Sequence, residues 1–495
     1  MSKLIIQNGN MCELDLPLKF AQKLYNEFAI RHPNAFYLRT RQRGMQNWDG
    51  KIHYITKTGQ FKIGLLPKVY DMCIEMGIKP KVVDMRQPLP KVSKVVTNIG
   101  KYKLRPEQEK AVKSVINNRV GDTPFHMGVL DYTVNAGKTL IMSSLYLTYK
   151  KQLKTLLITN DSDWLNQARE EFKQYLPGED ITFVQGKVLN WSNFTIGMVQ
   201  SISRNMRFYQ KELSQIDMVL VDEADQGGSK QYQNVITRLF NTRIRIGLSG
   251  TIYMSKLAKD KVKNMNLECF FGKVIAEFKL KDSIKKGYST KTIVKMVPGK
   301  PWYGNWESDC ISYKEIYDDS ITENNTAWTM AYNRLRWNIN QGRYPALVVC
   351  KHIAHCENLY KFFKKKLGDA YNIAYVHVNT PSKLRQQIMR DFREGKIDIL
   401  VSTTIIARGK NFPKLRYLLN AASMDSQEKS IQFLGRLVRT DKSKKKVYLD
   451  DLHYPGPYLD RHGKHRKQYY QRQELKVILL DKLWKKHPNH SLIKS

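Results

Sequence analysis

The chain has 495 residues, of which 42% are hydrophobic and 26% are charged. This length favours several domains, and the hydrophobic fraction is large enough to fill their cores. Lys and Arg number 83 against 45 Asp and Glu, which gives a formal net charge of +38. An excess of this size favours a polyanionic partner, above all nucleic acid, over a surface that is merely solubilising.

The sequence gives no sign of membrane insertion or secretion. No apolar run approaches the roughly 20 residues of a membrane-spanning helix, and the N-terminus lacks the blocks of a secretory signal. The six cysteines are widely scattered and do not suggest a disulfide framework. We therefore expect a reducing, cytoplasmic setting without a membrane partner.

Residues 1–95 are predicted to form a small, basic α+β domain. Leu16–Ala29 carries apolar residues at helical spacing, and a second helix is expected at Leu66–Met76. Short strands are expected at Phe36–Leu38 and Ile52–Ile55.

Two longer stretches, 96–290 and 291–450, alternate short apolar runs with helical segments. This alternation is typical of parallel sheets covered by helices. The expected strands are Leu156–Thr159, Thr195–Val199, Met218–Val221 and Ile244–Leu248, then Ala346–Cys350, Ala374–Val378, Ile397–Ser402 and Tyr417–Asn420. The predicted fold class is therefore α/β, with two tandem parallel-sheet domains, and a basic helical tail over 451–495.

The segment Asn135–Thr139 has the chemistry of a phosphate-binding turn between a strand and a helix. Gly137 lets backbone amides approach phosphates, Lys138 supplies a cation, and Thr139 offers a hydroxyl to Mg²⁺. Tyr132 stands where the first glycine of such a loop is expected, so an ordinary strand-to-helix turn is the alternative.

Two carboxylates that follow an apolar strand favour the nucleotide interpretation. Met218–Val221 delivers Asp222 and Glu223 at the strand end where such folds place a metal-binding acid. Asp222 is the candidate Mg²⁺ ligand beside Thr139, and Glu223 is the candidate base that orients and deprotonates the attacking water. The alternative is an exposed acidic turn.

A third block contributes the cations that phosphoryl transfer needs. Arg436 and Arg439 lie three residues apart and are expected to share one face of a helix. A planar, permanently charged guanidinium suits the spread charge of a transferring γ-phosphoryl group. Gln432 and Gly435 precede these arginines at the expected offsets, which favours this role over a solvated basic helix.

In order along the chain, these blocks resemble those of the superfamily 2 helicases and translocases, over about 105–440. The resemblance implies two RecA-like motor domains that hydrolyse ATP with Mg²⁺, and a nucleic-acid partner. The implied nucleotide-binding residues are Arg105, Gln108, Asn135, Ala136, Gly137, Lys138, Thr139 and Gly409. The implied nucleic-acid contacts are Gln200, Ser201 and Thr403, and the implied coupling residues are Ser249, Thr251 and Gln432.

Within that superfamily the chain is similar to the UvsW-type phage recombination helicases. The similarity rests on Asn47–Lys51, on Asn135–Lys138 and on the compact second motor domain. It implies branched, forked or single-stranded DNA as partner, 3′ to 5′ polarity, the host bacterial cytoplasm, and phage recombination or replication proteins as candidate partners. A nucleic-acid-dependent ATPase that remodels without separating strands is the alternative.

The tetrad Asp222–Asp225 is the one that names the DEAD-box RNA helicases. Gly250 and Gln432, however, stand where those proteins have alanine and histidine. The resemblance therefore favours DNA over RNA, a distinction that net charge cannot make.

Three smaller clusters have two interpretations each. Arg41, Arg43 and Trp48 are candidate nucleic-acid contacts, although Trp48 could equally anchor a small core. The Cys and His residues of 350–356 lack the two-pair separation of structural zinc sites, so no zinc is expected. In the tail, Tyr469 and Tyr470 are expected to pack a solvated helix onto the second motor domain.

Overall fold

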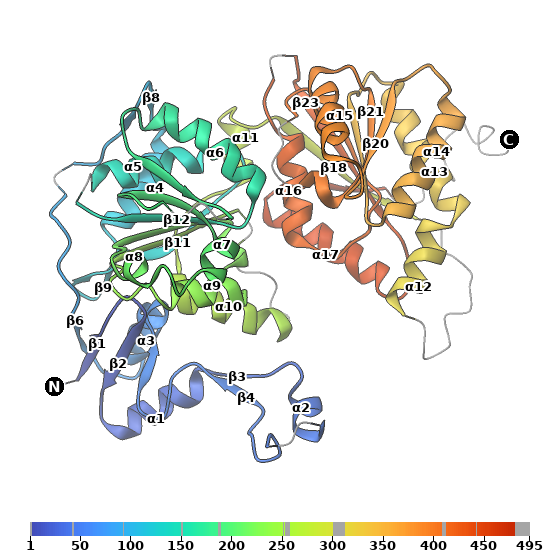
Figure 1. Cartoon of the computed structure of the whole chain (residues 1–495). Helices are drawn as coiled ribbons and strands as arrows, with labels where there is room; N and C mark the ends of the chain where they lie inside the picture. The colour runs from blue at the N-terminus through green and yellow to red at the C-terminus, as the bar shows by residue number, and fades with distance from the viewer. Residues whose placement is uncertain are drawn as a thin grey trace. The chain divides into compact units, whose positions relative to one another are not determined.

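The computed structural model describes residues 2–41, 44–92, 94–149, 152–186, 190–250, 252, 258–299, 312–407, 412–441 and 443–480. Contacts divide the chain into two compact units, Met1–Phe278 and Lys279–Ser495 (Figure 1). The first unit holds both the N-terminal region and the first large sheet. The second unit begins before the expected boundary at 290, because helix α11 (Leu280–Lys285) belongs to it.

The N-terminal region has its own four-stranded sheet, in the order β5-β2-β1-β6. Its strands are β1 (Lys3–Ile6), β2 (Met11–Asp15), β5 (Gln60–Lys62) and β6 (Lys81–Asp84). Helices α1 (Leu18–Glu27) and α3 (Leu66–Glu75) confirm the two expected helices. Leu24 of α1 and Val69 of α3 are fully buried, so both helices close one core with the sheet.

The strand expected at Phe36–Leu38 is wrong, because this segment lies in helix α2 (Ala35–Arg41). Phe36 is 79% exposed, so its apolar character does not reflect burial in a sheet. A run of three apolar residues is too short for its period to separate strand from helix. Helix α2 lies between β3 (Ala29–Arg31) and β4 (Lys51–His53), which pair antiparallel.

The main sheet of the first unit has seven parallel strands, in the order β13-β14-β12-β15-β16-β11-β17. They are β11 (Met127–Tyr132), β12 (Thr155–Thr159), β13 (Ile181–Val184), β14 (Phe194–Met198), β15 (Met218–Asp222), β16 (Ile244–Ser249) and β17 (Val274–Phe278). The four strands expected here are confirmed, with ends that differ by single residues.

Helices cover both faces of this sheet. Figure 1 shows α4 (Pro106–Ile116), α5 (Lys138–Thr148) and α6 (Ser162–Tyr175) on one face, and α9 (Lys230–Ile236) and α10 (Ala258–Phe271) on the other. Every residue of β12, β14 and β15 is therefore buried, as expected for a sheet covered on both sides. The short helices α7 (Val199–Arg204) and α8 (Gln210–Ser214) follow β14.

The second unit repeats the design, with seven parallel strands in the order β20-β21-β19-β22-β23-β18-β24. They are β18 (Lys291–Pro298), β19 (Ala346–Cys350), β20 (Ile373–Val376), β21 (Ile399–Thr403), β22 (Tyr417–Asn420), β23 (Lys446–His453) and β24 (Val477–Leu479). The four strands expected in this unit are confirmed with small shifts at their ends. The fold is therefore two tandem RecA-like domains preceded by a small α+β domain.

The faces of the second sheet are also covered. Figure 1 shows α13 (Asn325–Ile339) and α14 (Ile353–Leu367) on one face, and α16 (Gln427–Leu437) and α17 (Leu459–Arg472) on the other. The unit also contains α12 (Tyr313–Tyr317), the π-helix Asp318–Thr322, and α15 (Ser382–Glu394) against β20. Among the described residues, none of the helices has the length and apolar character needed to cross a bilayer.

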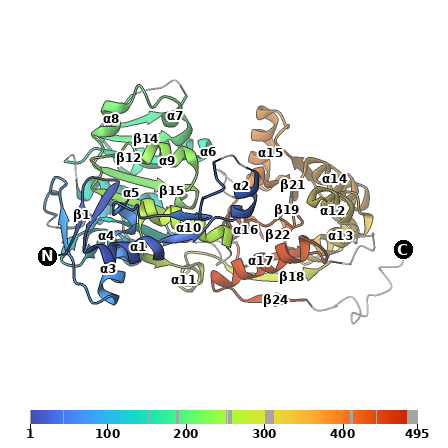
Figure 2. The same cartoon turned by 90° about the horizontal axis from the view of Figure 1, so that it is seen from below.

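The expected tail is built into the second unit. Residues 451–453 belong to β23, and β24 pairs with β18, with α17 beside them (Figures 1 and 2). Tyr469 is 9% and Tyr470 is 1% exposed, which confirms that they pack onto the domain. Arg466 is fully buried, so the helix that was expected to be solvated carries at least one cation in the core. Residues 481–495, the rest of the expected helical tail, lie outside the described residues.

Lys444 is a buried cation at the C-terminal end of α16. Its side chain donates to the carbonyl oxygens of Pro413, Leu415 and Leu437 at 2.7, 3.1 and 3.1 Å. Burial lowers the pKa of Lys444 to about 8, against the opposing charge of Asp441. Three carbonyls replace the water that the ammonium loses on folding, so the site is satisfied but still penalises the charge.

We expect Lys444 to make the chain more stable as the pH rises. Its folded-state pKa of about 8 lies below the ordinary value of 10.5, so the unfolded chain binds more protons between these limits. The contribution of Lys444 to the free energy of unfolding is therefore lowest below about pH 8 and rises between about pH 8 and pH 10.5. In urea unfolding, the native chain should gain roughly 1 kcal/mol over Lys444→Met between about pH 7.5 and about pH 9.

The matched control is Lys445→Met, which changes the exposed neighbouring lysine. Its unfolding free energy should follow the pH dependence of the native chain. A constant difference between the native chain and Lys444→Met over this pH range would contradict the assigned cause.

Candidate nucleotide-binding site

The predicted phosphate loop connects β11 to α5. Gly137, the residue before α5, has φ of 72°, and Asn135 has φ of 64°. Glycine adopts this left-handed conformation without cost, and asparagine tolerates it better than most residues. The first amides of α5 have no helical carbonyl partners and are suited to bind an anion.

Tyr132 does not disturb the loop by standing where a glycine was expected. It ends β11, is fully buried, and its hydroxyl donates to the carbonyl oxygen of Glu107 at 2.8 Å. The tight turn is supplied downstream by Asn135 and Gly137 instead. The strand–turn–helix geometry of a phosphate loop is therefore present despite the incomplete motif.

Gln108 lies against this loop at the start of α4. Its side-chain oxygen accepts from the amide of Arg105, and its side-chain nitrogen donates to the carbonyl oxygen of Ala136, both at 2.8 Å. A Cβ added to Gly137 would collide with the side-chain amide of Gln108, so only glycine fits there. Both ends of Gln108 are engaged within the chain, and its contact with adenine stays a prediction.

The acidic pair lies at the end of β15, at the same edge of the sheet: Asp222 is its last residue and Glu223 follows it. Asp222 is 5% exposed; burial raises the pKa of its carboxyl group, while the charge of Lys138 acts in the opposite direction. Among the described residues, Asp222 Oδ1 has no hydrogen-bond partner. Glu223 has φ of 51°, a strained conformation of the kind that gathers at functional sites. The structure thus brings Lys138 and Asp222 together.

The side chains at this edge fit a nucleotide with Mg²⁺. A buried carboxylate with a spare oxygen, together with the hydroxyl of Thr139 at the start of α5, offers the hard oxygen ligands that Mg²⁺ prefers. The ammonium of Lys138 can neutralise phosphate. Within the described residues, the amide atoms of Asn135 are buried without hydrogen-bond partners, so this side chain can also serve a bound phosphate.

The predicted coupling residue Ser249 is tied directly to the acidic turn. It ends β16, and its hydroxyl donates to Asp225 Oδ1 at 2.7 Å, with both residues 2% exposed. Asp225 lies in the short helical turn Ala224–Gln226 that follows Glu223. A shift of this turn would therefore move the end of β16. Thr251 lies outside the described residues.

The predicted nucleic-acid residues of the first unit are held by the chain itself. Gln200, at the start of α7, donates to the carbonyl oxygen of Asn160 at 3.4 Å, and Asn160 donates to Gln226 of the acidic turn. The hydroxyl of Ser201, only 8% exposed, accepts from the amide of Gly186 at 2.9 Å. These loops are linked to the nucleotide site, and their contact with nucleic acid stays a prediction.

The N-terminal candidates lie on the hairpin that carries α2. Arg41 ends α2, with its guanidinium 5.1 Å from the ring centre of Tyr37. Trp48 is half-buried, and its indole nitrogen donates to the carbonyl oxygen of Lys51 at 2.8 Å. It therefore fastens the hairpin. Arg43 lies outside the described residues.

A cavity of about 540 Å³ opens beside this hairpin. Its lining includes Arg31, Arg39, Phe36 and Lys51, with one acidic residue, Asp49. The sequence pointed to the arginines of α2 but missed Arg31, which lies on β3 and reaches the same place only through the hairpin pairing. Cations beside an exposed aromatic ring suit a nucleic-acid backbone with an unstacked base.

In the second unit, Gln432 and Arg436 lie on α16, which ends at Leu437. Arg439 follows the helix, and its carbonyl oxygen accepts from the hydroxyl of Thr290 at 3.2 Å. The two arginines therefore do not share a helical face, because the helix stops between them. Both side chains are half-buried.

The block around Thr403 is partly described. Thr403 ends β21 and is 7% exposed, and the neighbouring Thr404 accepts from the ammonium of Lys429 at 3.2 Å. Gly409 lies outside the described residues. In the 350–356 segment, His355 is buried, its ring nitrogen lies 3.2 Å from the hydroxyl of Tyr317, and burial lowers its pKa to about 3.

Two family models match the chain. The type III restriction enzyme res subunit model covers residues 101–254, and the helicase conserved C-terminal domain model covers residues 331–441. The first match spans the phosphate loop and the acidic turn. The second spans most of the second sheet and all of α16.

Curated relatives include the ATP-dependent DNA helicase uvsW of Enterobacteria phage T4, which is 21% identical over 436 residues, or 82% of each chain. A putative helicase of a Sulfolobus islandicus filamentous virus is 22% identical over 71% of this chain and 64% of its own. The putative ATP-dependent helicase IRC3 of Saccharomyces cerevisiae is 22% identical over 70% of this chain and 51% of its own. The chain thus spans less than two thirds of the latter two relatives.

Solved structures show the same fold at low identity. A fragment of a putative HsdR subunit of a type I restriction enzyme from Vibrio vulnificus gives a TM-score of 0.57 at 15% identity, over 83% of this chain and 73% of its own. Dbp5 of Saccharomyces cerevisiae gives 0.52 at 14% identity, over 79% and 93%. In its paired domains and in the order of the two matched models, the chain is similar to the superfamily 2 helicases.

Proposed function

We propose that this protein is an ATP-dependent DNA helicase or translocase that acts on branched, forked or single-stranded DNA with 3′ to 5′ polarity. The observation that carries the proposal is the pairing of Lys138 with the buried carboxyl group of Asp222 at one edge of the first sheet. A buried carboxylate is costly unless a ligand uses it, and Mg²⁺–ATP is the ligand that suits both this carboxylate and the cation of Lys138.

In this mechanism the first unit holds the nucleotide. Lys138 and the first amides of α5 bind the phosphates, while Thr139 and Asp222 hold Mg²⁺. When bound, the metal neutralises charge on the phosphate oxygens. Glu223 orients the attacking water and takes its proton. Arg436 and Arg439 stabilise the charge that spreads over the γ-phosphoryl group during transfer.

Coupling to the nucleic acid would run through the hydrogen bonds around the acidic turn. Ser249 bonds Asp225, and Asn160 bonds Gln226. Phosphate release alters the charge next to this turn, and the bonded loops carry Gln200 and Ser201, the candidate nucleic-acid contacts. Coupling requires only that the acidic turn has two conformations and that the nucleotide and the nucleic acid each favour one of them.

Support for DNA as the substrate comes from the relatives. The phage relative that covers 82% of this chain is named a DNA helicase. Relatives named RNA helicases match shorter segments, 18% of the chain for RhlB of Shewanella woodyi and 46% for CHR1 of Candida albicans. An RNA helicase and a nucleic-acid-dependent remodeller remain the alternative functions.

We expect Lys138→Ala and Glu223→Gln each to lower DNA-stimulated ATP turnover at least about 100-fold. Lys138→Ala should also weaken nucleotide binding, because it removes the phosphate cation. Glu223→Gln should retain binding, because the amide keeps the shape but cannot accept the proton. Phosphate release and fluorescent-nucleotide titration would measure the two effects.

The control for this pair is Lys110→Ala, which changes an exposed lysine on α4 and should leave turnover unchanged. Full ATPase activity in Lys138→Ala would show that the phosphate loop is misassigned.

Strand displacement should separate the functional alternatives. We expect forks and four-way junctions to stimulate ATPase activity more than an RNA duplex does. A partial duplex with a 3′ overhang should be unwound, whereas one with a 5′ overhang should not. Stimulation without displaced strand would favour the remodeller, and stronger stimulation by RNA would favour the RNA helicase.

Arg41→Ala should weaken DNA binding through the loss of one phosphate contact. The slope of log affinity against log salt should fall by about 1, while ATPase activity at saturating DNA is retained. Fluorescence anisotropy at several salt concentrations would measure this. Lys57→Ala, an exposed cation in the turn before β5, is the control. Equal slopes for Arg41→Ala and the native chain would remove Arg41 from the interface.

A further inference from the structure

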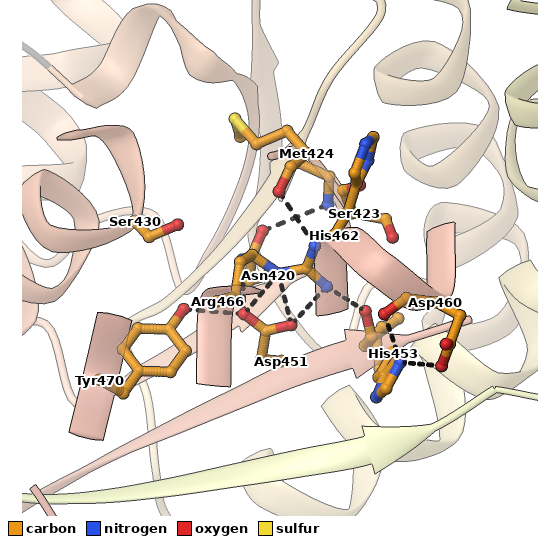
Figure 3. A network of polar contacts seen from close by, with 12 residues as sticks. Asn420, Ser423, Met424, Ser430, Asp451, His453, Asp460, His462, Arg466 and Tyr470 are labelled. Atoms are coloured by element: carbon orange, nitrogen blue, oxygen red, sulfur yellow. Dashed lines mark hydrogen bonds and ion pairs between the residues drawn. The ribbon is translucent and has the colours of Figure 1, made fainter. Parts of the chain in front are cut away.

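The loop between β22 and α16, residues 421–426, is bonded at its start by Tyr317 of α12 and by β19, through Ala422 and Ala421. Helix α17 bonds the rest of the loop. The matched helicase C-terminal model ends at residue 441, whereas α17 begins at Leu459, so this helix lies outside the matched domain. Figure 3 shows the polar network that α17 forms with the loop and with β23.

Arg466 is the centre of this network. It is fully buried, and its Nε donates to Asp451 Oδ1 at 2.9 Å while Nη2 donates to the carbonyl oxygen of Leu452 at 2.9 Å. The third nitrogen, Nη1, donates to the carbonyl oxygen of Met424 in the loop at 3.0 Å. One guanidinium therefore fixes the loop relative to β23.

Asp451 accepts from three side chains on two elements, which makes the anchor rigid. Besides Arg466, it accepts from the hydroxyl of Tyr470 at 2.7 Å and from the side-chain amide of Asn420 at 2.8 Å. These donors lie on α17 and β22, and Asp451 itself is fully buried on β23. Buried charges with complete hydrogen bonding have few alternative arrangements.

A second tie from α17 reaches Asp425 near the end of the loop. His465 Nδ1 lies 3.0 Å from Asp425 Oδ1, and the hydroxyl of Tyr469 donates to the same oxygen at 3.1 Å. Burial by itself raises the pKa of Asp425, but the bonds and charge of His465 outweigh it and bring the pKa below its ordinary value. The Asp425 carboxylate is therefore kept charged and held in place.

Two further contacts complete the tie. His462 Nδ1 lies 3.4 Å from the carbonyl oxygen of Ser423, which has φ of 44°, and Arg472 donates to the side chain of Gln427 at 3.2 Å. Residues 462, 465, 466, 469 and 472 follow helical spacing, so one face of α17 makes every contact described here. This face of α17 therefore contacts residues 423–427, the segment that leads into α16.

The entry to α16 decides where its functional side chains lie. Ser426 caps the helix by accepting from the amide of Lys429 at 3.3 Å, and Gln427 begins it. Gln432 and Arg436 follow within the same rigid rod, and Lys444 fastens its last turn through Leu437. A shift or tilt at the loop would displace the guanidinium of Arg436.

We propose that α17 is a positioning element for ATP hydrolysis, in which Arg466, His465 and Tyr469 set the place of the arginines of α16 and just beyond it. This inference rests on the proposed function, since it requires Arg436 to act on the γ-phosphoryl group. On this proposal, α17 contributes to ATP hydrolysis although it lies beyond residue 441, where the matched domain ends. Positioning errors of about 1 Å are known to cost large factors in rate.

The variants that test this inference weaken the tie without emptying the core. Removing Arg466 would leave Asp451 buried without its counter-charge and would endanger folding. Asp425→Asn keeps the shape but weakens the bonds from His465 and Tyr469, and Tyr469→Phe removes one hydroxyl. We expect each to lower kcat of DNA-stimulated ATPase about tenfold, with KM for ATP within about twofold and a nearly unchanged urea midpoint.

Two comparisons assign the effect to the arginines. Lys464→Ala changes an exposed cation of α17 that pairs with Asp460 and should leave kcat unchanged. In an Arg436→Lys background, which keeps the charge but not the fork, Asp425→Asn should have little further effect. If Asp425 acts through Arg436, the effects of the two substitutions on kcat are not additive.

The outcomes separate this inference from the proposed function. If Arg436→Lys and Arg436→Ala keep full activity, the proposed role of the arginine fails. If those variants lose activity while Asp425→Asn and Tyr469→Phe keep the native kcat, the positioning role of α17 alone is overturned. A full tenfold loss from Asp425→Asn in the Arg436→Lys background would also overturn it, as would a loss of folded protein that accounts for the whole fall in rate.

Discussion

The nucleotide site depends on one electrostatic constraint: the carboxyl group of Asp222 is buried next to the ammonium of Lys138. Parallel strands place both residues at the same edge, since β11 leads into the phosphate loop and β15 ends at the acid. Burial penalises the charge of Asp222 and the ammonium of Lys138 offsets part of that penalty, so this edge of the sheet is suited to receive a ligand that carries both signs. Phosphate and a divalent cation together provide those signs.

Hydrogen bonds connect the segments of the first unit that surround Lys138 and Asp222. The acidic turn is bonded to β16 through Ser249, and to the loop after β12 through Asn160. Gln108 closes the other side by bonding the phosphate loop at Ala136. A ligand that shifts any one of these segments therefore strains hydrogen bonds in the others, which is the physical basis for a cooperative response.

The sequence was most informative where burial on both sides produced unmistakable apolar runs, as in β12, β15 and β19. It failed at α2, because three apolar residues carry no reliable period. It also placed Arg436 and Arg439 on one helical face, since nothing local shows that α16 ends at Leu437. The role of Arg466 was out of reach for a different reason. Its carboxylate partner, Asp451, lies on β23, and no local pattern shows that α17 turns Arg466 toward that strand instead of toward solvent.

The strongly cationic composition has an internal use as well as an external one. Arg245, Lys444 and Arg466 are buried, and each donates to main-chain carbonyl oxygens of segments distant in sequence. Such a cation joins segments through their main-chain carbonyl groups, at the cost of losing its hydration. Arg466 and Lys444 do so at the two ends of α16, the helix that carries Arg436. Among the described residues, few cations are buried in this way, so the excess available to a polyanion is hardly reduced. The same residue types can therefore stiffen the helix that carries Arg436 and still leave a surface suited to nucleic acid.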